Sequence, residues 1–344
     1  MNEDQPANLR ARGLLKLTRY AIEAALFFAF IGFFRVLGID AASGLGGFIG
    51  RSVFYRLPVT NRARTNLRAA FPSKPDAEIE TIVRAMCDNL GRTVAEYAHL
   101  DKMTIGGAHP RLIESVAPGE PDATAIARAA SERGNGIMFF SGHFANWEVM
   151  PFIAVELGFG GGEVYRPQNN PFVDRWLVRQ RMIRGPKDQI AKGSQGTRRI
   201  FSLLRKNRTI CLLVDQKTNE GVPAIYFGRE AMTTPAPAAL ALKLGSALVP
   251  AQLERTRGAH FRFRIHPPID FAPSSKDERD IVALTQLLTS KIEEMVRENP
   301  AQWLWIHRRW PTDREQDRVR GKRALQGSGG GAGVRVESEG SSLT

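Results

Sequence analysis

Short apolar runs that alternate with helix-like segments constrain the fold of this 344-residue chain more than any other feature. Continuous apolar runs at residues 136–140, 209–214 and 247–253 are typical of buried strands. Residues 163–165 predict a short strand, and residues 260–265 alternate with period two, as a half-exposed or edge strand does. Helical patterns cover residues 122–133, 171–184, 194–206, 235–244 and 276–297. This alternation predicts an α/β fold with a central mixed β-sheet flanked by helices.

The apolar stretch at residues 21–37, interrupted only by Glu23 and Arg35, predicts an N-terminal hydrophobic membrane-associating helix. Its length of about 17 residues is the lower limit for a span, and basic residues on both sides leave its orientation open. The pattern fits monotopic or hairpin insertion, aided by residues 45–49, as well as it fits a span. The alternative is a helix buried in the protein core. We expect a basic segment and membrane anchor at 1–60, a catalytic domain at 61–312 and a disordered, dispensable Gly/Ser-rich tail at 313–344.

The chain is strongly basic, with 48 Lys and Arg against 35 Asp and Glu and a net charge of +13. This excess favours an anionic partner, which is a nucleic acid, an anionic lipid or an acidic protein. Basic and aromatic residues do not interleave as in a known nucleic-acid-binding module, and the apolar N-terminus also argues against nucleic acid. The two cysteines, Cys87 and Cys211, form no CxxC pair, which argues against a disulfide framework and against a cysteine zinc site.

The clearest candidate for chemistry is FFSGHFANWE at residues 139–148, where an apolar strand ends and His143 follows a glycine. Histidine can take a proton from a hydroxyl near neutral pH, and a carboxylate bonded to its second nitrogen selects the tautomer. Glu148 is the candidate carboxylate. Five residues on one helix separate two side chains by about 140°, so the pair requires His143 in the loop and Glu148 in the first helical turn. The alternative is a strand–helix junction whose Ser141 and Asn146 only cap the helix.

Two other predicted strands also end in polar residues: Arg166 and Asn169 follow 163–165, and Asp215 follows 209–214. Ligands of open α/β sheets bind outside the carboxyl ends of the strands, so one crevice should gather these side chains with His143. Arg166 can hold a phosphate or a developing oxyanion, or form a surface ion pair. Asp215 can orient a substrate amide or hydroxyl, anchor Arg166, or serve only a structural turn. Arg166, Asn169 and Asp215 are the predicted substrate-binding residues.

The block from Gly142 to Glu148 resembles the HX4D/E signature of the lysophospholipid acyltransferase superfamily, and its Asn-Trp-Glu ending resembles the bacterial lipid A late acyltransferases of the lauroyl and myristoyl type. The resemblance covers about residues 10–312, and the sequence departs mildly from the family at 144–145 and at Pro151. Four further segments match in order: Asn66-Leu67 with Phe71-Pro72; Tyr165-Arg166-Pro167 with Asn170-Pro171; Val214-Asp215-Gln216 with Phe227-Gly228 and Thr233; and the stretch from Trp305 to Trp310.

This resemblance implies an acyl–acyl carrier protein donor and a lipid A precursor acceptor at the cytoplasmic face of the bacterial inner membrane. It implies direct acyl transfer without an acyl-enzyme, with no metal and no cofactor. His143 would deprotonate the acceptor hydroxyl, Glu148 would orient His143, and Arg166 would position a phosphate or the oxyanion. The acidic carrier protein would dock on basic residues of two predicted helices, unless these only form solvated faces: Arg175, Arg179, Arg181, Arg184, Arg198, Arg199 and Arg205.

Three interpretations remain open from the sequence. The acceptor can be another polar lipid, such as a phosphatidylinositol mannoside or an amino-acid lipid. A metal-dependent hydrolase would use His143, Glu148 and Asp215 as ligands, although the chain has no HExxH motif. The segment WLWIHRRW at residues 303–310, which contains His307, predicts either a lipid-interface patch or a core-sealing strand.

Overall fold

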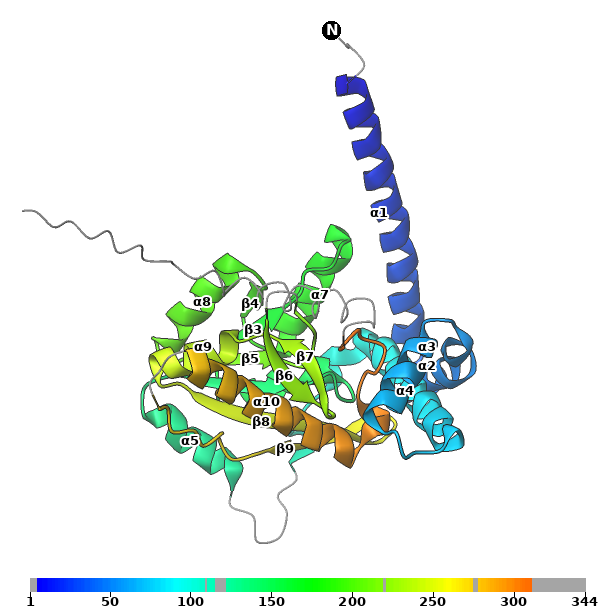
Figure 1. Ribbon diagram of the computed structural model, residues 1–344. Helices are drawn as coiled ribbons and strands as arrows, with labels where there is room; N and C mark the ends of the chain where they lie inside the picture. The colour runs from blue at the N-terminus through cyan, green and yellow to red at the C-terminus, as the bar shows by residue number, and fades with distance from the viewer. Residues whose placement is uncertain (1–4, 109, 115–121, 219–220, 275–277, 311–344) are drawn as a thin grey trace, which may run out of the picture. The chain divides into compact units, whose positions relative to one another are not determined.

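A seven-stranded sheet in the order β1-β9-β8-β2-β5-β3-β4 forms the centre of the computed structural model, which describes residues 5–108, 110–114, 122–218, 221–274 and 278–310 (Figure 1). Strands β2, β3, β4 and β5 run parallel to their neighbours, whereas β8 runs parallel to β2 but antiparallel to β9. The predicted mixed sheet is therefore confirmed. The strands are β1 (Leu112–Glu114), β2 (Ile137–Ser141), β3 (Gly161–Tyr165), β4 (Asp188–Ala191), β5 (Thr209–Leu213), β8 (Ala247–Arg257) and β9 (His260–Ile265).

The three continuous apolar runs became β2, β5 and β8, which are neighbours in the middle of the sheet. Strand β9 has the predicted half-exposed alternation, but it is not the edge, because β1 pairs with its outer side. The short or polar strands β1 and β4 were not predicted. Neither was the hairpin of β6 (Val222–Tyr226) and β7 (Arg229–Thr233). Its two-residue turn, Phe227-Gly228, has positive φ angles of 51° and 69°, which match the twist of a hairpin.

Helices cover both faces of the sheet, as predicted. On one face, α5 (Ala123–Glu132) and α6 (Met150–Glu156) contribute Ala127 and Ile153 to a core with Phe139 and Cys211. On the other face, α8 (Ser194–Leu204) and α9 (Ala236–Leu244) pack against β5 and β8, respectively. The remaining elements around the sheet are α7 (Pro171–Arg184), α10 (Glu278–Glu298), η3 (Trp147–Val149) and η4 (Pro300–Gln302).

The predicted N-terminal helix is α1 (Gln5–Val36), which is longer than the apolar stretch read from the sequence. Its segment Leu15–Val36 is long and apolar enough to cross a membrane, and only 11% of its apolar stretch is buried. Leu26 and Phe33 are among the exposed side chains, so the alternative of a buried core helix was wrong. One side of α1 contacts α7, where the Phe27 and Trp176 rings lie 5.3 Å apart.

Helices α2 (Ile39–Ser52) and α4 (Asp76–Glu96) pack so closely that a Cβ on Gly50 would lie 2.0 Å from the Cys87 carbonyl oxygen. The residues suggested for hairpin insertion lie in α2, and Phe48 and Ile49 are exposed there. Helix α3 (Thr60–Ala70), η1 (Phe54–Arg56) and η2 (Tyr97–Lys102) complete this part. The described residues up to Arg309 form one compact unit. The boundary predicted at residue 60 stays a prediction, and the predicted tail at 313–344 lies outside the described residues.

Candidate active site

A tight turn after β2 presents His143 at the carboxyl edge of the sheet. Glycine is required at position 142, because a Cβ there would lie 3.1 Å from Asp215 Oδ2 and 2.8 Å from the Phe144 ring. A larger residue would therefore push the carboxylate of Asp215 away from the backbone of His143. The strand–turn sequence thus places an imidazole against a neighbouring strand end.

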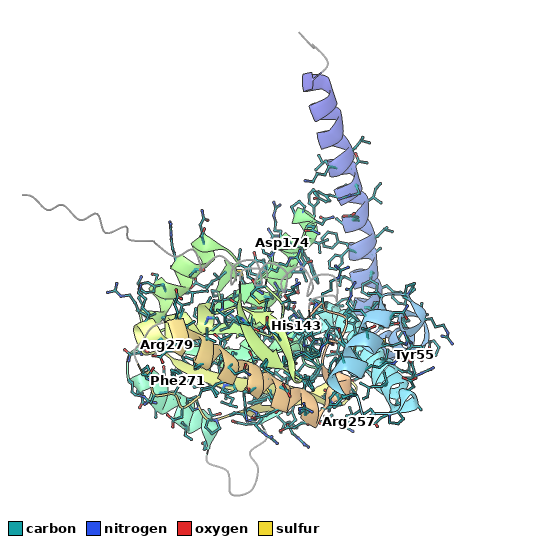
Figure 2. All side chains as sticks on the ribbon, in the orientation of Figure 1. Tyr55, His143, Asp174, Arg257, Phe271 and Arg279 are labelled. Atoms are coloured by element: carbon teal, nitrogen blue, oxygen red, sulfur yellow. The ribbon has the colours of Figure 1, made fainter. Side chains whose placement is uncertain are left out.

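Helix α4 holds the far side of this turn. Ala145 adopts a left-handed φ of 46°, which costs a non-glycine residue about 1–2 kcal/mol. Its carbonyl oxygen accepts hydrogen bonds from Asn89 Nδ2 at 3.2 Å and from Thr93 Oγ1 at 2.9 Å, and these bonds offset part of that strain. These bonds tie the turn that carries His143 to α4, and His143 itself lies in the interior of the molecule (Figure 2).

Asp215, and not Glu148, is the carboxylate that holds the His143 ring. Strands β2 and β5 are parallel neighbours with Ser141 opposite Leu213, so the residues two positions further on lie side by side. Asp215 Oδ1 lies 2.8 Å from His143 Nδ1, while Oδ2 accepts from the His143 backbone N–H at 2.7 Å and from Trp303 Nε1 at 2.8 Å. The predicted contact of Asp215 with substrate was wrong, because its side chain is fully buried behind the ring.

The charge on Asp215 determines the tautomer of His143. Burial alone would raise the pKa of Asp215, but the adjacent His143 and its two hydrogen bonds outweigh burial and hold that pKa well below its usual range. An ionised carboxylate only accepts hydrogen bonds, so Nδ1 of His143 carries the proton. Nε2 therefore has the lone pair that a general base needs.

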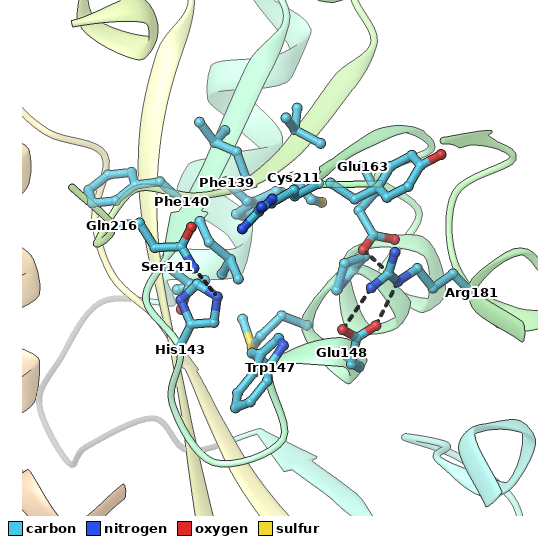
Figure 3. Close-up of a pocket in the computed structure, with 18 of the residues that line it drawn as sticks. Phe139, Phe140, Ser141, His143, Trp147, Glu148, Glu163, Arg181, Cys211 and Gln216 are labelled. Atoms are coloured by element: carbon cyan, nitrogen blue, oxygen red, sulfur yellow. Dashed lines mark hydrogen bonds and ion pairs between the residues drawn. The ribbon is translucent and has the colours of Figure 1, made fainter. Parts of the chain in front are cut away.

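Gln216 connects His143 to a second histidine. Its Nε2 lies 3.1 Å from His143 Nε2 (Figure 3). The same nitrogen lies 3.4 Å from His307 Nε2, so the amide can donate one hydrogen to each ring. Burial, together with the neighbouring His143, lowers the pKa of His307 to about 4, so this ring is neutral at physiological pH and can accept. Asn66 Nδ2 donates to the His307 carbonyl oxygen at 2.8 Å and thereby fixes the segment.

Glu148 lies on the opposite side of the cavity from His143, in an ion pair with Arg181 (Figure 3). Its carboxylate accepts from Arg181 Nε at 2.6 Å, from Arg181 Nη2 at 2.8 Å and from the Tyr97 hydroxyl at 2.7 Å. The expected hydrogen bond between Glu148 and His143 was therefore wrong. The physical reason is the turn at 144–146, which directs Glu148 toward α7. The metal-hydrolase alternative fails for the same reason, since its three ligands do not converge.

A second carboxylate adjoins this ion pair. Glu163 Oε1 lies 3.6 Å from Arg181 Nε, and burial raises the pKa of Glu163 to about 7, although Arg181 opposes the shift. Burial would raise the pKa of Glu148 too, but the charge and hydrogen bonds of Arg181 outweigh it and the pKa is lowered. Arg181 is 6% exposed, so it cannot belong to the predicted carrier-docking face.

The predicted site residues meet in one cavity of about 350 Å³, within the range of ligand pockets. His143, Glu148, Arg166 and Asn169 line it, whereas Asp215 supports it from behind. Apolar side chains make up much of the remaining wall: Phe139, Met150, Ile153, Cys211, Ala251 and Ile265. The cavity therefore offers a basic nitrogen beside a space suited to a hydrocarbon chain.

Arg181, Glu163 and His307 also belong to this site, although the sequence did not predict them as members of it. The only signal for His307 was the aromatic–basic segment WLWIHRRW, for which a lipid-interface patch and a core-sealing strand were both open. Trp303 and Trp305 are 1% and 0% exposed, so these two rings belong to the core and not to a lipid-interface patch. Their segment bonds the catalytic turn, since Leu304 N donates to the His143 carbonyl oxygen at 3.2 Å.

The fold and the site together define an α/β protein in which a carboxylate-held histidine lies beside an apolar cavity. A general base next to a space for a hydrocarbon chain is typical of an enzyme that transfers acyl groups. Comparison with known proteins is more specific. The model of the bacterial lipid A biosynthesis acyltransferase family matches residues 11–312, and the chain belongs to this family. A lipid A biosynthesis acyltransferase of Haemophilus influenzae is 26% identical over 256 residues, which are 73% of this chain and 76% of the relative.

Two other acyltransferases match shorter stretches of the chain. A lipid A biosynthesis lauroyltransferase of Escherichia coli K12 is 26% identical over 192 residues, 54% of this chain and 59% of the relative. A phosphatidylinositol mannoside acyltransferase of Mycobacterium tuberculosis is 29% identical over 116 residues, 33% of this chain and 35% of the relative. The family predicted from the motifs is thereby confirmed, and the chain is an acyltransferase by membership.

Proposed function

We propose that this chain transfers a fatty acyl group from an acyl carrier protein thioester directly onto a hydroxyl of a lipid A-type acceptor. The observation that carries the proposal is the His143–Asp215 pair, whose Nε2 lone pair stands in an apolar cavity. The family and its Haemophilus influenzae relative support the acceptor class. The net charge of +13 supports both an acidic carrier protein and an anionic lipid.

The chemical steps follow from the atoms of this pair. His143 Nε2 takes the hydroxyl proton as the hydroxyl oxygen bonds to the thioester carbonyl carbon, and Asp215 stabilises the resulting imidazolium. The tetrahedral intermediate then expels the thiolate, the C–S bond breaks, and the thiolate sulfur takes the proton back from Nε2. Ester and free thiol are the products, and the enzyme ends in its starting protonation state without an acyl-enzyme.

The hydrogen bond from Gln216 to His143 must break before this reaction can start, because the amide donates to the same Nε2 lone pair that must accept from the acceptor hydroxyl. The other amide hydrogen stays bonded to His307 Nε2. The released hydrogen is then available to the thioester oxygen as that oxygen becomes negative. Ser141 Oγ, a buried atom in the same wall with no hydrogen-bond partner in the described part of the chain, can supply a second donor.

The Glu148–Arg181 ion pair is assigned a positioning role on the opposite wall of the cavity. Arg181 belongs to α7, and Arg166 and Asn169 belong to the segment between β3 and α7, so the pair ties this segment to the turn that carries His143. Arg166 then contacts the acceptor phosphate or the oxyanion, and Asn169 contacts the acceptor head. The pair shapes the site without touching the transferred proton.

Association with the cytoplasmic face of the bacterial inner membrane fits this function. The exposed apolar surface of α1 would enter the bilayer, which brings the cavity within reach of a lipid acceptor. Basic residues of α7 and α8 would receive the carrier protein: Arg175, Arg179, Arg198 and Arg199, all of them at least partly accessible. Arg181 is left out of this proposed face because it is 6% exposed.

A phosphatidylinositol mannoside is the alternative acceptor, because a relative from Mycobacterium tuberculosis carries the name phosphatidylinositol mannoside acyltransferase. The purified full chain in detergent micelles is offered acyl carrier protein thioesters with either acceptor, and the lipid products are identified by mass spectrometry. Acylation of the lipid A precursor is expected. Acylation of the mannoside alone would replace the proposed acceptor, and hydrolysis of the thioester without acylation would overturn the proposed reaction.

Two variants test the assigned residues in the same assay. His143→Ala should abolish transfer while the protein stays folded by circular dichroism, because the general base is gone. Glu148→Ala should also lose transfer, because Arg181 loses its principal counter-charge and the cavity wall relaxes. Near-wild-type transfer by His143→Ala would refute the mechanism. Near-wild-type transfer by Glu148→Ala would refute only the positioning role.

A further inference from the structure

A second cavity, of about 390 Å³, lies between the sheet and helices α8 and α9. None of the predicted site residues except Arg166 lines it. Its wall is mainly apolar and comes from β2, β5, α8 and α9: Met138, Ile210, Leu212, Ile200, Pro237 and Leu240. A cavity of this size and lining suits a hydrocarbon chain better than a polar ligand.

The two cavities lie on opposite faces of the sheet. Successive side chains of a strand point to opposite faces, and β2 and β5 are paired in register. The Phe139–Cys211 pair lines the first cavity, and the Met138–Ile210 pair lines the second. The cavities meet at the carboxyl ends of β3, β4 and β5, where both linings include the same six residues: Val164, Arg166, Lys192, Leu212, Leu213 and Gln216. Each therefore reaches the edge where His143 stands.

Three cations gather at this shared edge. Arg166 follows β3, Lys192 follows β4, and Lys217 follows β5 by four residues. All three line the second cavity, and Arg166 and Lys192 also line the first. Within the described part of the chain, the side chains of Arg166 and Lys192 make no hydrogen bond and no ion pair. Helix α8 begins directly beyond Lys192, and its N-cap, Gly193, provides no side-chain hydrogen bond to the first turn. An anion at this edge would meet cations and uncapped backbone N–H groups together.

We propose that the second cavity binds a hydrocarbon chain already carried by the acceptor lipid, with the acceptor's phosphate held by Arg166, Lys192 and Lys217. This inference rests on the proposed function, which supplies two substrates that both carry chains. His143 and Ser141 line only the first cavity, and the donor chain extends directly from the reacting carbonyl carbon. The donor chain must therefore occupy the first cavity. An acceptor lipid that carries several groups can place one chain and its phosphate across the end of β5 while its reacting hydroxyl stays beside His143.

Filling the second cavity tests this assignment. Ile200→Trp places an indole ring in the cavity, where the isoleucine of α8 now lies. The matched control is Ile183→Trp, at an exposed position of α7 that lines neither cavity. KM is measured for an acylated phosphoglucosamine disaccharide, for its short-chain analogue and for the acyl carrier donor. Ile200→Trp should raise KM for the long-chain acceptor at least about tenfold, because each buried methylene contributes roughly a factor of four. KM for the short-chain acceptor and for the donor, and every KM of the control variant, should change less than about twofold.

Two results of this experiment would overturn the proposal. An equal rise in donor KM would place the donor chain in the second cavity, and unchanged constants would mean that neither chain enters it. Charge is tested separately: Lys192→Gln should weaken binding of the phosphorylated acceptor and leave a dephosphorylated acceptor unaffected. Equal weakening of both acceptors would exclude a phosphate contact.

Photo-crosslinking of the wild-type protein gives an answer that is independent of folding and of turnover. An acylated phosphoglucosamine disaccharide with a diazirine at the end of one chain is irradiated with the full chain in micelles, and labelled peptides are mapped by mass spectrometry. Label on α8 and α9 is expected. Label only on first-cavity peptides, such as those of α6, would overturn the assignment. If the wild type binds this lipid in the second cavity but transfers no acyl group, the proposed function fails while the binding site stands.

Discussion

Replacing Asp215 by asparagine is the sharpest perturbation that the structure offers. The carboxylate receives three N–H groups: His143 Nδ1 on Oδ1, and the His143 backbone N–H and Trp303 Nε1 on Oδ2. Asparagine has the same shape but only one acceptor oxygen. Because two donors converge on Oδ2, the amide oxygen will take that place and the amide NH2 will face the ring.

The consequence is an inverted tautomer. His143 Nδ1 must then accept a hydrogen bond from the amide, so the ring proton moves to Nε2 and the lone pair facing the cavity is lost. The equivalent replacement behind a catalytic histidine in a Ser-His-Asp enzyme lowers kcat roughly 10⁴-fold. We expect a loss of roughly 10³–10⁴-fold in kcat here, equivalent to about 4–5 kcal/mol in the activation barrier. The KM for either substrate should change little, because the fully buried carboxylate does not reach the cavity.

The assay is steady-state transfer from acyl carrier protein thioester, with Asp40→Asn as the matched control, because the Asp40 carboxylate pairs with Arg111 and does not line the cavity. Folding is checked by thermal unfolding, where loss of the charge on three hydrogen bonds should cost about 1–3 kcal/mol. The pKa of Asp215 is depressed in the folded state, so its stabilisation is present above the unfolded pKa and lost as pH falls toward the folded pKa. The stability gap between wild type and variant should therefore narrow below about pH 4. A folded Asp215→Asn protein within tenfold of wild-type kcat would refute the reasoning.

Two further predictions concern other atoms of the site. Gln216→Ala should lower kcat roughly 10²-fold at unchanged acceptor KM, if its amide stabilises the carbonyl oxygen; a higher kcat would mean that the amide only blocks His143. Glu163 has a pKa raised from 4.5 to about 7, so the folded protein holds a proton there that the unfolded chain releases, and stability should fall as pH rises from about 4.5 to about 7. In Glu163→Gln, urea unfolding across this range should lack that fall, and an unchanged pH dependence would assign it to another group.

The sequence alone determined the fold class, the central strands and the position of the histidine. Strands β2, β5 and β8 are continuous apolar runs, and such runs report burial on both faces whatever their neighbours are. The Gly142–His143 turn was readable because a short glycine-bounded strand end is a local pattern. Strand β4, with the polar sequence DQIA, had no local signal, since its place beside β3 depends on pairing.

Only the tertiary structure decided which carboxylate serves the histidine. Glu148 is near in sequence, but Asp215, 72 residues away, makes the bond, because the sheet places β5 beside β2. The order of strands in a sheet arises from packing among elements distant in the chain, and no local periodicity encodes it. The same holds for the two cavities: alternation along β2 predicts two faces, but what covers each face depends on helices that the chain supplies much later.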